Sequence, residues 1–215
     1  MVRLTGSTDH VCVRGAFVAR ISAAERREQF LEAAVTVIAR DGVDGATTRK
    51  IADEARSPLA TLHYCFQTKE NLLFALYEQL FSEIRVEAPT ALATGASAAQ
   101  PVEDLMTETM RWVVDHPVRA RATIEITLWA ERNDPGMAGR LYALFLEAWS
   151  ELLLRAGIPL PAEAVETFVR LLIAMADGLT LQMIAEQDAE RTMRDTATAC
   201  RVLKAYLEGS SSKAA

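Results

Sequence analysis

Residues 47–73, TTRKIADEARSPLATLHYCFQTKENLL, decide the fold that we expect for this chain. Ile51, Ala52 and Ala55 recur at the spacing of three to four residues that puts side chains on one face of a helix. Pro58 cannot donate a backbone hydrogen bond, and it disfavours helical geometry at the residue before it. The stretch therefore predicts two short helices separated by a tight turn, followed by the start of a longer helix.

Two short helices joined by such a turn form a helix-turn-helix, whose second helix fits the major groove of DNA. Periodicity alone leaves a second interpretation open, in which the stretch is a helical corner that carries solvated charges. The motif residues decide between the two interpretations. They are Thr47-Thr48, Ile51-Ala52, Ala60-Thr61-Leu62, Phe66 and Lys69-Glu70-Asn71-Leu72-Leu73.

In these residues the chain resembles the tetracycline-repressor (TetR) family of bacterial transcriptional regulators, over about residues 22–80. The resemblance implies DNA binding. The chain departs from the usual pattern at Arg56-Ser57, where Gly-Val is commoner, and at His63-Tyr64, which reverses the usual order. A turn of this kind often needs a positive φ, which is costly for Arg56. The two departures leave the operator sequence open.

Position within the motif assigns the DNA contacts. Thr48 and Arg49 lie at a helix start, where a backbone amide and the helix dipole favour a phosphate. Tyr64 and Lys69 are expected to contact phosphates, with Arg56 as a further candidate, and Arg20 to reach a minor groove. The residues expected to face base edges are Ser57, Leu59, Ala60, Thr61 and His63.

The net charge of −6 over 215 residues does not look like that of a DNA-binding protein. The charge is unevenly divided, however: residues 1–69 hold 10 Lys+Arg and 8 Asp+Glu, whereas residues 70–215 hold 13 and 21. The acidity thus belongs to the C-terminal part, and a locally basic surface near the N-terminus stays possible.

The three cysteines, Cys12, Cys65 and Cys200, are odd in number and show no CxxC spacing. They give little support to disulfides or a metal site, and fit a reducing, cytoplasmic setting. Arg14 interrupts the apolar residues near the N-terminus, so a signal peptide is not expected, and we saw no apolar run long enough to span a membrane.

The rest of the chain predicts an all-α protein of about nine helices. Expected helix ends are Ser22 with Glu25 as a capping box, Gly42, Thr48, Thr68, Pro101, Pro117, Pro135, Pro161 and Asp188. We expect a flexible arm at residues 1–21, a helix-turn-helix domain at 22–69, an effector-binding and dimerisation domain at 70–208, and a disordered tail at 209–215.

The family resemblance implies a homodimer formed by the last two long helices. The sequence supports this, because the helix around Leu171 is apolar on nearly every side, although an internal helix of a monomer would look the same. Asp177 is unusual there, since a charge needs a partner or solvent; a dimer contact is favoured over a ligand contact. The expected interface is Phe168, Leu171, Asp177, Gly178, Leu181 and Tyr206.

The resemblance also implies a pocket for a small-molecule effector. Aromatic and Met side chains with a few hydroxyls are typical of apolar ligand pockets, although such residues at helical spacing are more often plain core. Glu125 and Glu131 offer acids for a cationic effector, but Arg121 can pair with Glu125. The candidates are Phe74, Tyr77, Met106, Thr109, Met110, Trp112, Trp129, Phe145, Trp149 and Met175.

We therefore expect a ligand-responsive repressor that binds a palindromic operator as a homodimer and is released by a small-molecule effector. The alternative is a helix-turn-helix adaptor without an effector. An enzyme is unlikely, because the chain has no Glu-x-x-His pair, G-x-S-x-G, P-loop or G-x-G-x-x-G. No cofactor or metal is expected.

Overall fold

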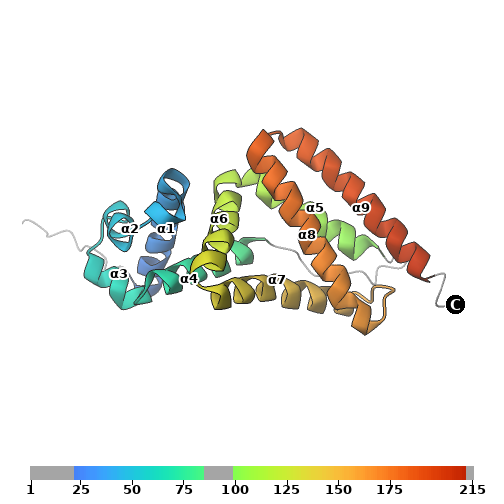
Figure 1. Ribbon diagram of the computed structural model, residues 1–215, viewed down its shortest axis with the longest axis horizontal. Coiled ribbons are helices and arrows are strands. Elements are labelled where there is room, and N and C mark those ends of the chain that lie inside the picture. The colour runs from blue at the N-terminus through green and yellow to red at the C-terminus, as the bar shows by residue number, and fades with distance from the viewer. Residues whose placement is uncertain (1–21, 85–98, 212–215) are drawn as a thin grey trace, which may run out of the picture.

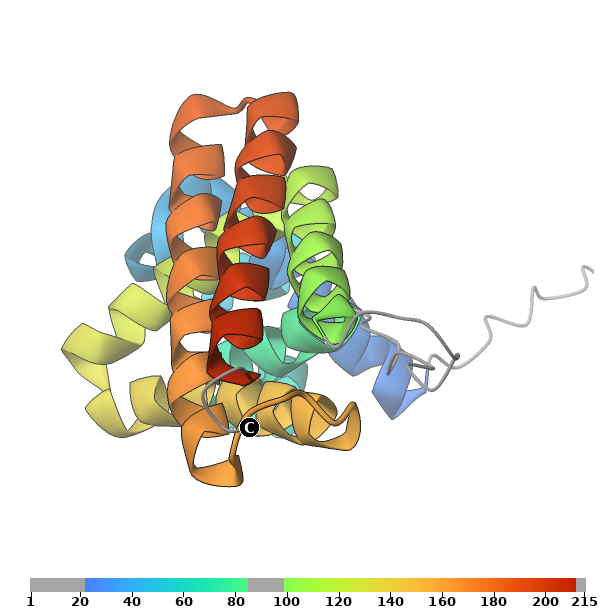
Figure 2. The ribbon, with the colours of Figure 1, turned by 90° about the vertical axis from the view of Figure 1, so that its right-hand side faces the viewer.

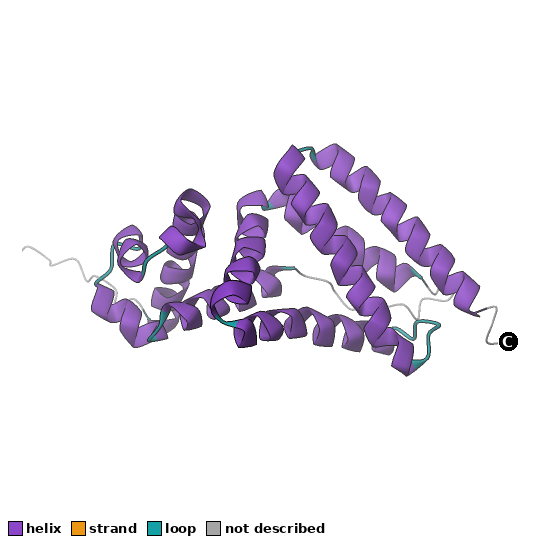
Figure 3. Ribbon diagram, viewed as in Figure 1, coloured by secondary structure: helices purple, strands orange, loops and turns teal. Residues whose placement is uncertain are grey.

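The computed structural model describes residues 22–84 and 99–211, and within these ranges every regular element is an α-helix (Figure 3). The helices are α1 Ala23–Gly45, α2 Thr48–Glu54, α3 Leu59–Phe66, α4 Lys69–Glu83, α5 Gln100–Asp115, α6 Pro117–Asn133, α7 Pro135–Arg155, α8 Ala162–Glu186 and α9 Ala189–Ser211. The prediction of an all-α protein with about nine helices is confirmed. The expected arm at residues 1–21, including Arg20 and Cys12, lies outside the described residues.

Local sequence explains most helix ends. The Ser22 side chain accepts a hydrogen bond from the Glu25 amide at 3.1 Å, and Glu25 returns one to the Ser22 amide at 2.7 Å, so the capping box is confirmed. Thr68 caps α4, and Asp188 accepts from the Arg191 amide at the start of α9.

Two expected helix ends are wrong by a few residues. The N-cap of α2 is Thr47, whose hydroxyl accepts from the Lys50 amide, and not Thr48, which is the first helical residue. Thr47 has the extended backbone that an N-cap requires. Residues 209–211 continue α9, whereas we expected the tail to begin at residue 209.

Gly42, where we expected the first helix to end, is instead a bend within α1, which runs on to Gly45. Its φ of 70° lies in the left-handed region, which glycine adopts without a steric penalty, and the chain resumes a helical turn after it. A buried Val43 follows directly. This bend brings the end of α1 against α6.

The helices form two groups (Figure 1). Helices α1, α2 and α3 make a small bundle at one end, where Phe30 and Phe66 meet edge to face with ring centroids 6.2 Å apart. Helix α4 runs from this bundle into the larger group, and α6 packs against both α1 and α4. At the far end α5, α8 and α9 lie side by side (Figure 2).

One described helix, α8, is long and apolar enough by length and composition to cross a membrane, although we expected no such run from the sequence. A single helix of this kind is weak support for a membrane span, because core helices of soluble proteins have the same composition. Here α8 packs against α5, α6, α7 and α9.

Candidate nucleic-acid interface and interior pocket

The turn between α2 and α3 is held by backbone hydrogen bonds. The amide of Arg56 donates to the carbonyl of Asp53, and that of Ser57 to the carbonyl of Ala52, both at 3.0 Å. Arg56 has a φ of 49°, so the positive φ anticipated for this turn is present on a non-glycine residue. The turn therefore keeps the helix-turn-helix geometry despite the departure in sequence.

The outer face of α3 is open to solvent. The Tyr64 side chain is 86% exposed, an unusual state for a large aromatic ring, whereas Leu62 and Phe66 on the opposite face are buried. Of the residues predicted to contact DNA, Arg49, Ala60, His63 and Tyr64 are exposed, and Thr48, Ser57, Leu59, Thr61 and Lys69 are half-buried.

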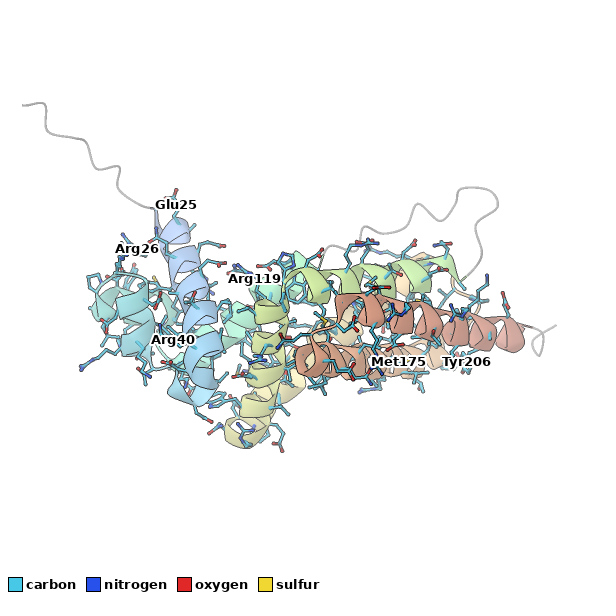
Figure 4. The ribbon with its side chains drawn as sticks, turned by 90° about the horizontal axis from the view of Figure 1, so that it is seen from above. Glu25, Arg26, Arg40, Arg119, Met175 and Tyr206 are labelled. Carbon is cyan, nitrogen blue, oxygen red and sulfur yellow. The ribbon has the colours of Figure 1, made fainter. Side chains whose placement is uncertain are left out.

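Arginines of α1 border this face, and sequence reasoning missed them. Arg26 donates to the Ser57 hydroxyl at 3.3 Å, and the Arg27 guanidinium stacks 4.5 Å from the centroid of the Phe66 ring (Figure 4 labels Arg26). The sequence held one signal that could have found them. Both arginines follow directly after the Ser22 capping box and therefore lie at the start of the first helix. Their charge adds to that of Arg49, which forms no ion pair within the described ranges.

Lys69, which we expected to contact a phosphate, is half-buried and has contacts within the protein. Its Nζ donates to the carbonyl of Val43 at 2.6 Å and lies 5.3 Å from the centroid of the Trp129 ring. Burial lowers the pKa of this ammonium group. Lys69 thus ties the start of α4 to the end of α1 and to α6.

A second set of contacts completes this joint between the small bundle and the larger group. The Val43 amide donates to Glu125 of α6 at 3.2 Å, so Glu125 is not paired with Arg121 as we had suggested. Arg119, also on α6, binds Glu32 of α1 at 2.6 Å and Glu83 of α4 at 2.8 Å (Figure 4). We call these contacts, together with those of Lys69 to Val43 and Trp129, the α6 joint.

The larger group contains a partly open cavity of about 50 Å³ between α4, α5, α6, α7 and α8. Phe145 meets Tyr77 and Trp149 edge to face, with ring centroids 6.2 and 5.5 Å apart. The lining residues are Tyr77, Ile84, Thr109, Trp112, Val113, Thr123, Ile124, Thr127, Tyr142, Phe145, Trp149, Ile173, Ala176, Asp177 and Thr180.

The cavity includes only some of the predicted ligand contacts. Tyr77, Thr109, Trp112, Phe145 and Trp149 line it, and the other candidates do not. Met106 and Met110 are wholly buried in the core, Met175 is half-buried, Phe74 lies under Arg140, and Trp129 belongs to the α6 joint. All five residues lie on helices that border the cavity, but their side chains are not part of its lining.

Asp177 lies at the cavity and not only on the outer face of α8 where we had placed it. The Tyr142 hydroxyl donates to its carboxylate at 3.0 Å, and no described residue forms an ion pair with it. Burial raises the pKa of Asp177 above its ordinary value, and burial together with the nearby Asp177 raises the pKa of Tyr142 to about 12.

The outer faces of α8 and α9 carry an apolar stripe. Leu181 and Tyr206 are 50% and 53% exposed, and Leu171 and Val202 are similarly open. Gly178 has no neighbouring atom within 4 Å of an added Cβ, which leaves room beside the helix. Phe168 is buried and stacks on Tyr206 at 5.7 Å, so within one chain it supports the stripe and is not part of its open surface.

The helix-turn-helix part of the chain matches a known protein family. Residues 30–76, which include the helix-turn-helix, match the family described as bacterial regulatory proteins, tetR family. The chain is 31% identical over 175 residues to the HTH-type nicotine-responsive transcriptional repressor HdnoR of Paenarthrobacter nicotinovorans. The aligned region covers 80% of this chain and 90% of that protein. The chain belongs to the TetR family.

Other TetR-type regulators are similar over most of the chain. The HTH-type transcriptional regulator BetI of Rhizobium meliloti is 28% identical over 158 residues, or 73% of this chain and 77% of that protein. The solved structure of the fatty acid degradation regulator FadR from Bacillus halodurans superposes with a TM-score of 0.68 at 16% identity, over 83% of this chain and 94% of that one. TetR-family proteins are DNA-binding transcriptional regulators and not enzymes.

Proposed function

We propose that this TetR-family regulator is a cytoplasmic repressor that binds a palindromic operator as a homodimer and leaves it when a small molecule occupies the interior cavity. The observation that carries the proposal is that α4 and α6 each contribute both to the cavity and to the α6 joint. Tyr77 and Lys69 lie on α4, and Thr127 and Glu125 lie on α6. A change in the cavity therefore reaches α1 through two helices.

The apolar stripe of α8 and α9 supports the proposed homodimer. Leu171, Gly178 and Leu181 repeat along one side of α8 at helical spacing, and Val202 and Tyr206 do the same on α9. A two-fold axis along this stripe makes one patch serve both subunits. In operator-binding dimers of this kind the two recognition helices lie about 34–36 Å apart, one turn of DNA.

Release needs a ligand that binds the DNA-free arrangement of the two α3 helices more tightly than the DNA-bound one. A ligand larger than the present cavity pushes its walls apart, and α4 and α6 are two of those walls. The relative from Paenarthrobacter nicotinovorans is described as nicotine-responsive, which supports a small organic molecule as the effector here.

The test is a fluorescence-anisotropy titration with DNA fragments from around the protein's own gene, at several salt concentrations. Affinity is expected to fall steeply as salt rises, because phosphate contacts release counterions. A compound that raises Tm by binding the folded state is then added to the complex. DNA release by that compound supports the proposal; a protein that binds DNA but is released by no stabilising compound is the adaptor and not the ligand-responsive repressor.

A further inference from the structure

The cavity has an unbalanced set of polar groups. Its described lining contains one charged side chain, the carboxylate of Asp177, and no Lys, Arg or His. The carboxylate has one neutral hydrogen-bond donor, the Tyr142 hydroxyl at 3.0 Å. Asp177 is half-buried and Tyr142 is 41% exposed, so the pair lies at the edge of the cavity. A carboxylate partly withdrawn from water is normally paired with a cation or bound by several donors. Asp177 thus has unused capacity to bind a positive group.

The hydroxyls of the cavity point to the same ligand chemistry. Thr109 donates its proton to the Leu105 carbonyl at 2.7 Å, and Thr127 donates to the Thr123 carbonyl at 2.9 Å. Thr123 itself donates to the Ala120 carbonyl at 2.7 Å. The lining also holds the hydroxyls of Tyr77 and Thr180 and the indole N–H of Trp112, which has no hydrogen-bond partner among the described residues. The three threonine hydroxyls have spent their donors within their own helix and keep only oxygen lone pairs to offer. Such oxygens accept from a ligand N–H and give nothing to a ligand carbonyl or carboxylate.

The walls between these groups are aromatic. Tyr77, Trp112, Tyr142, Phe145 and Trp149 come from α4, α5 and α7, so that rings approach the cavity from three helices. The faces of aromatic rings attract a cation, and the attraction grows when water is excluded. An anion meets the opposite situation at Asp177, because the carboxylate repels it.

The size of the cavity limits the part of the ligand that fits without rearrangement. About 50 Å³ is far smaller than the roughly 300–1,000 Å³ of drug-sized pockets. Only a small part of a ligand, such as a protonated amino group with its first carbon atoms, fits in this volume without rearrangement. An attached apolar body would have to displace side chains of the aromatic wall.

From these observations we infer that the effector is a hydrophobic organic amine, protonated at neutral pH, whose ammonium group binds Asp177 while its apolar body contacts the surrounding rings. The inference rests on the proposed function, since it concerns the chemical class of the effector at the same cavity. It gives Asp177 a ligand-binding role in place of the dimer contact expected from sequence.

The test compares two probes of equal shape, 2-phenylethylamine and neutral 2-phenylethanol, by calorimetric titration of the full-length protein. Titration extends to about 10 mM, because fragments of this size bind weakly. We expect the amine to bind at least about tenfold more tightly than the alcohol, since the charge pair is desolvated. Equal affinities, or no binding of the amine, overturn the inference.

Two variants locate the preference. Asp177→Asn keeps the shape and the acceptor for Tyr142, and is expected to lose the preference for the amine. Glu163→Gln removes an equal charge from the exposed first turn of α8, and is expected to keep it. Circular dichroism checks that both variants are folded. An Asp177→Asn protein that still prefers the amine overturns the assignment to this carboxylate.

DNA release separates failure of this inference from failure of the proposed function. The complex with DNA is titrated with each probe in the same anisotropy assay. If the alcohol binds and releases DNA as well as the amine does, the cavity is the effector site and the amine class is wrong. If the amine binds through Asp177 and DNA stays bound, the ligand class holds and the release mechanism is wrong.

Discussion

Tyr64 presents its ring to solvent on the face of α3 that we assign to DNA, and buries almost none of it within the protein. Tyr64→Ala should therefore leave Tm unchanged while weakening DNA binding about tenfold, the loss expected for a hydrogen bond to a charged phosphate. The loss should be similar for specific and unrelated sequences, because phosphates carry no base information. Anisotropy titrations with both kinds of DNA check this.

Tyr64→Phe is the matched variant, since it keeps the ring and removes the hydroxyl. If the Tyr64→Phe protein binds DNA as weakly as the Tyr64→Ala protein does, the hydroxyl makes the contact. If the Tyr64→Phe protein binds DNA as well as the wild-type protein does, the ring makes the contact through packing. Full affinity in both variants would contradict the assignment of this face to DNA.

The Asp177 carboxylate should lower the stability of the ligand-free protein. Because burial raises its pKa in the folded state, the folded protein holds the proton to a higher pH than the unfolded chain does. The free energy of unfolding therefore falls as pH rises from the ordinary Asp pKa to the raised pKa of the folded state. At pH values above the folded-state pKa the whole loss is present. Each pKa unit corresponds to about 1.4 kcal/mol.

Asp177→Asn should accordingly raise Tm at pH 7, by about 2–4 °C for each kcal/mol recovered in a chain of this size. The gain should shrink as the pH is lowered toward the ordinary Asp pKa, where the wild-type carboxyl is protonated in both states. Thermal unfolding across this pH range measures it. A Tm gain that is the same at every pH would show that the carboxylate charge is not its cause.

At the scale of elements, α6 is the helix that joins the two groups. Arg119 binds one carboxylate on α1 and another on α4, and is itself largely shielded from solvent. Arg119→Met should leave Glu32 and Glu83 close together without their cation, at a cost of about 1–3 kcal/mol. It should also raise the ligand concentration needed for DNA release, since one connection between cavity and α1 is removed.

Arg111→Met is the control for this prediction. Arg111 pairs with Glu108 on the exposed surface of α5, and both partners lie on one helix. Such pairs contribute about 0–1 kcal/mol, so this variant should change neither Tm nor DNA release appreciably. Arg119→Met and Arg111→Met with equal effects on DNA release would argue against a role for the α6 joint.

At the scale of the whole molecule, the apolar stripe on α8 and α9 predicts the assembly state. Leu181→Lys puts a charge in the middle of the stripe and should convert the dimer to a monomer at micromolar concentration, as measured by analytical ultracentrifugation. Leu154→Lys is the matched control, because Leu154 is 51% exposed but lies on α7 away from the stripe. A wild-type monomer, or dissociation by both variants, would contradict the proposed interface.

The sequence predicted best those features that depend on neighbours along the chain. The Ser22–Glu25 capping box, the cap at Thr68 and the positive φ at Arg56 each depend on residues a few positions apart. Features that depend on how helices pack were predicted less well. Lys69 and Trp129 were assigned to DNA and to the ligand, yet they meet each other at the α6 joint.

Asp177 shows why the packing was out of reach. Helix α8 is apolar on nearly every side, so its periodicity does not distinguish the face toward the cavity from the face toward a second subunit. The partner that settles the matter is Tyr142, which lies 35 positions away and on another helix. Within the aromatic set, the same reasoning found Tyr77 and Phe145 and misplaced Phe74, because only the packing of α4 against α7 separates them.

The small volume of the cavity has a consequence for the speed of ligand binding. A molecule larger than about 50 Å³ fits completely only after side chains of the aromatic wall have moved. If the wall opens before the ligand arrives, the observed association rate should level off at high ligand concentration, at the rate constant of opening. Stopped-flow tryptophan fluorescence can follow this, because Trp112 and Trp149 line the cavity. Replacing Phe145 with Leu should raise the plateau by loosening the wall.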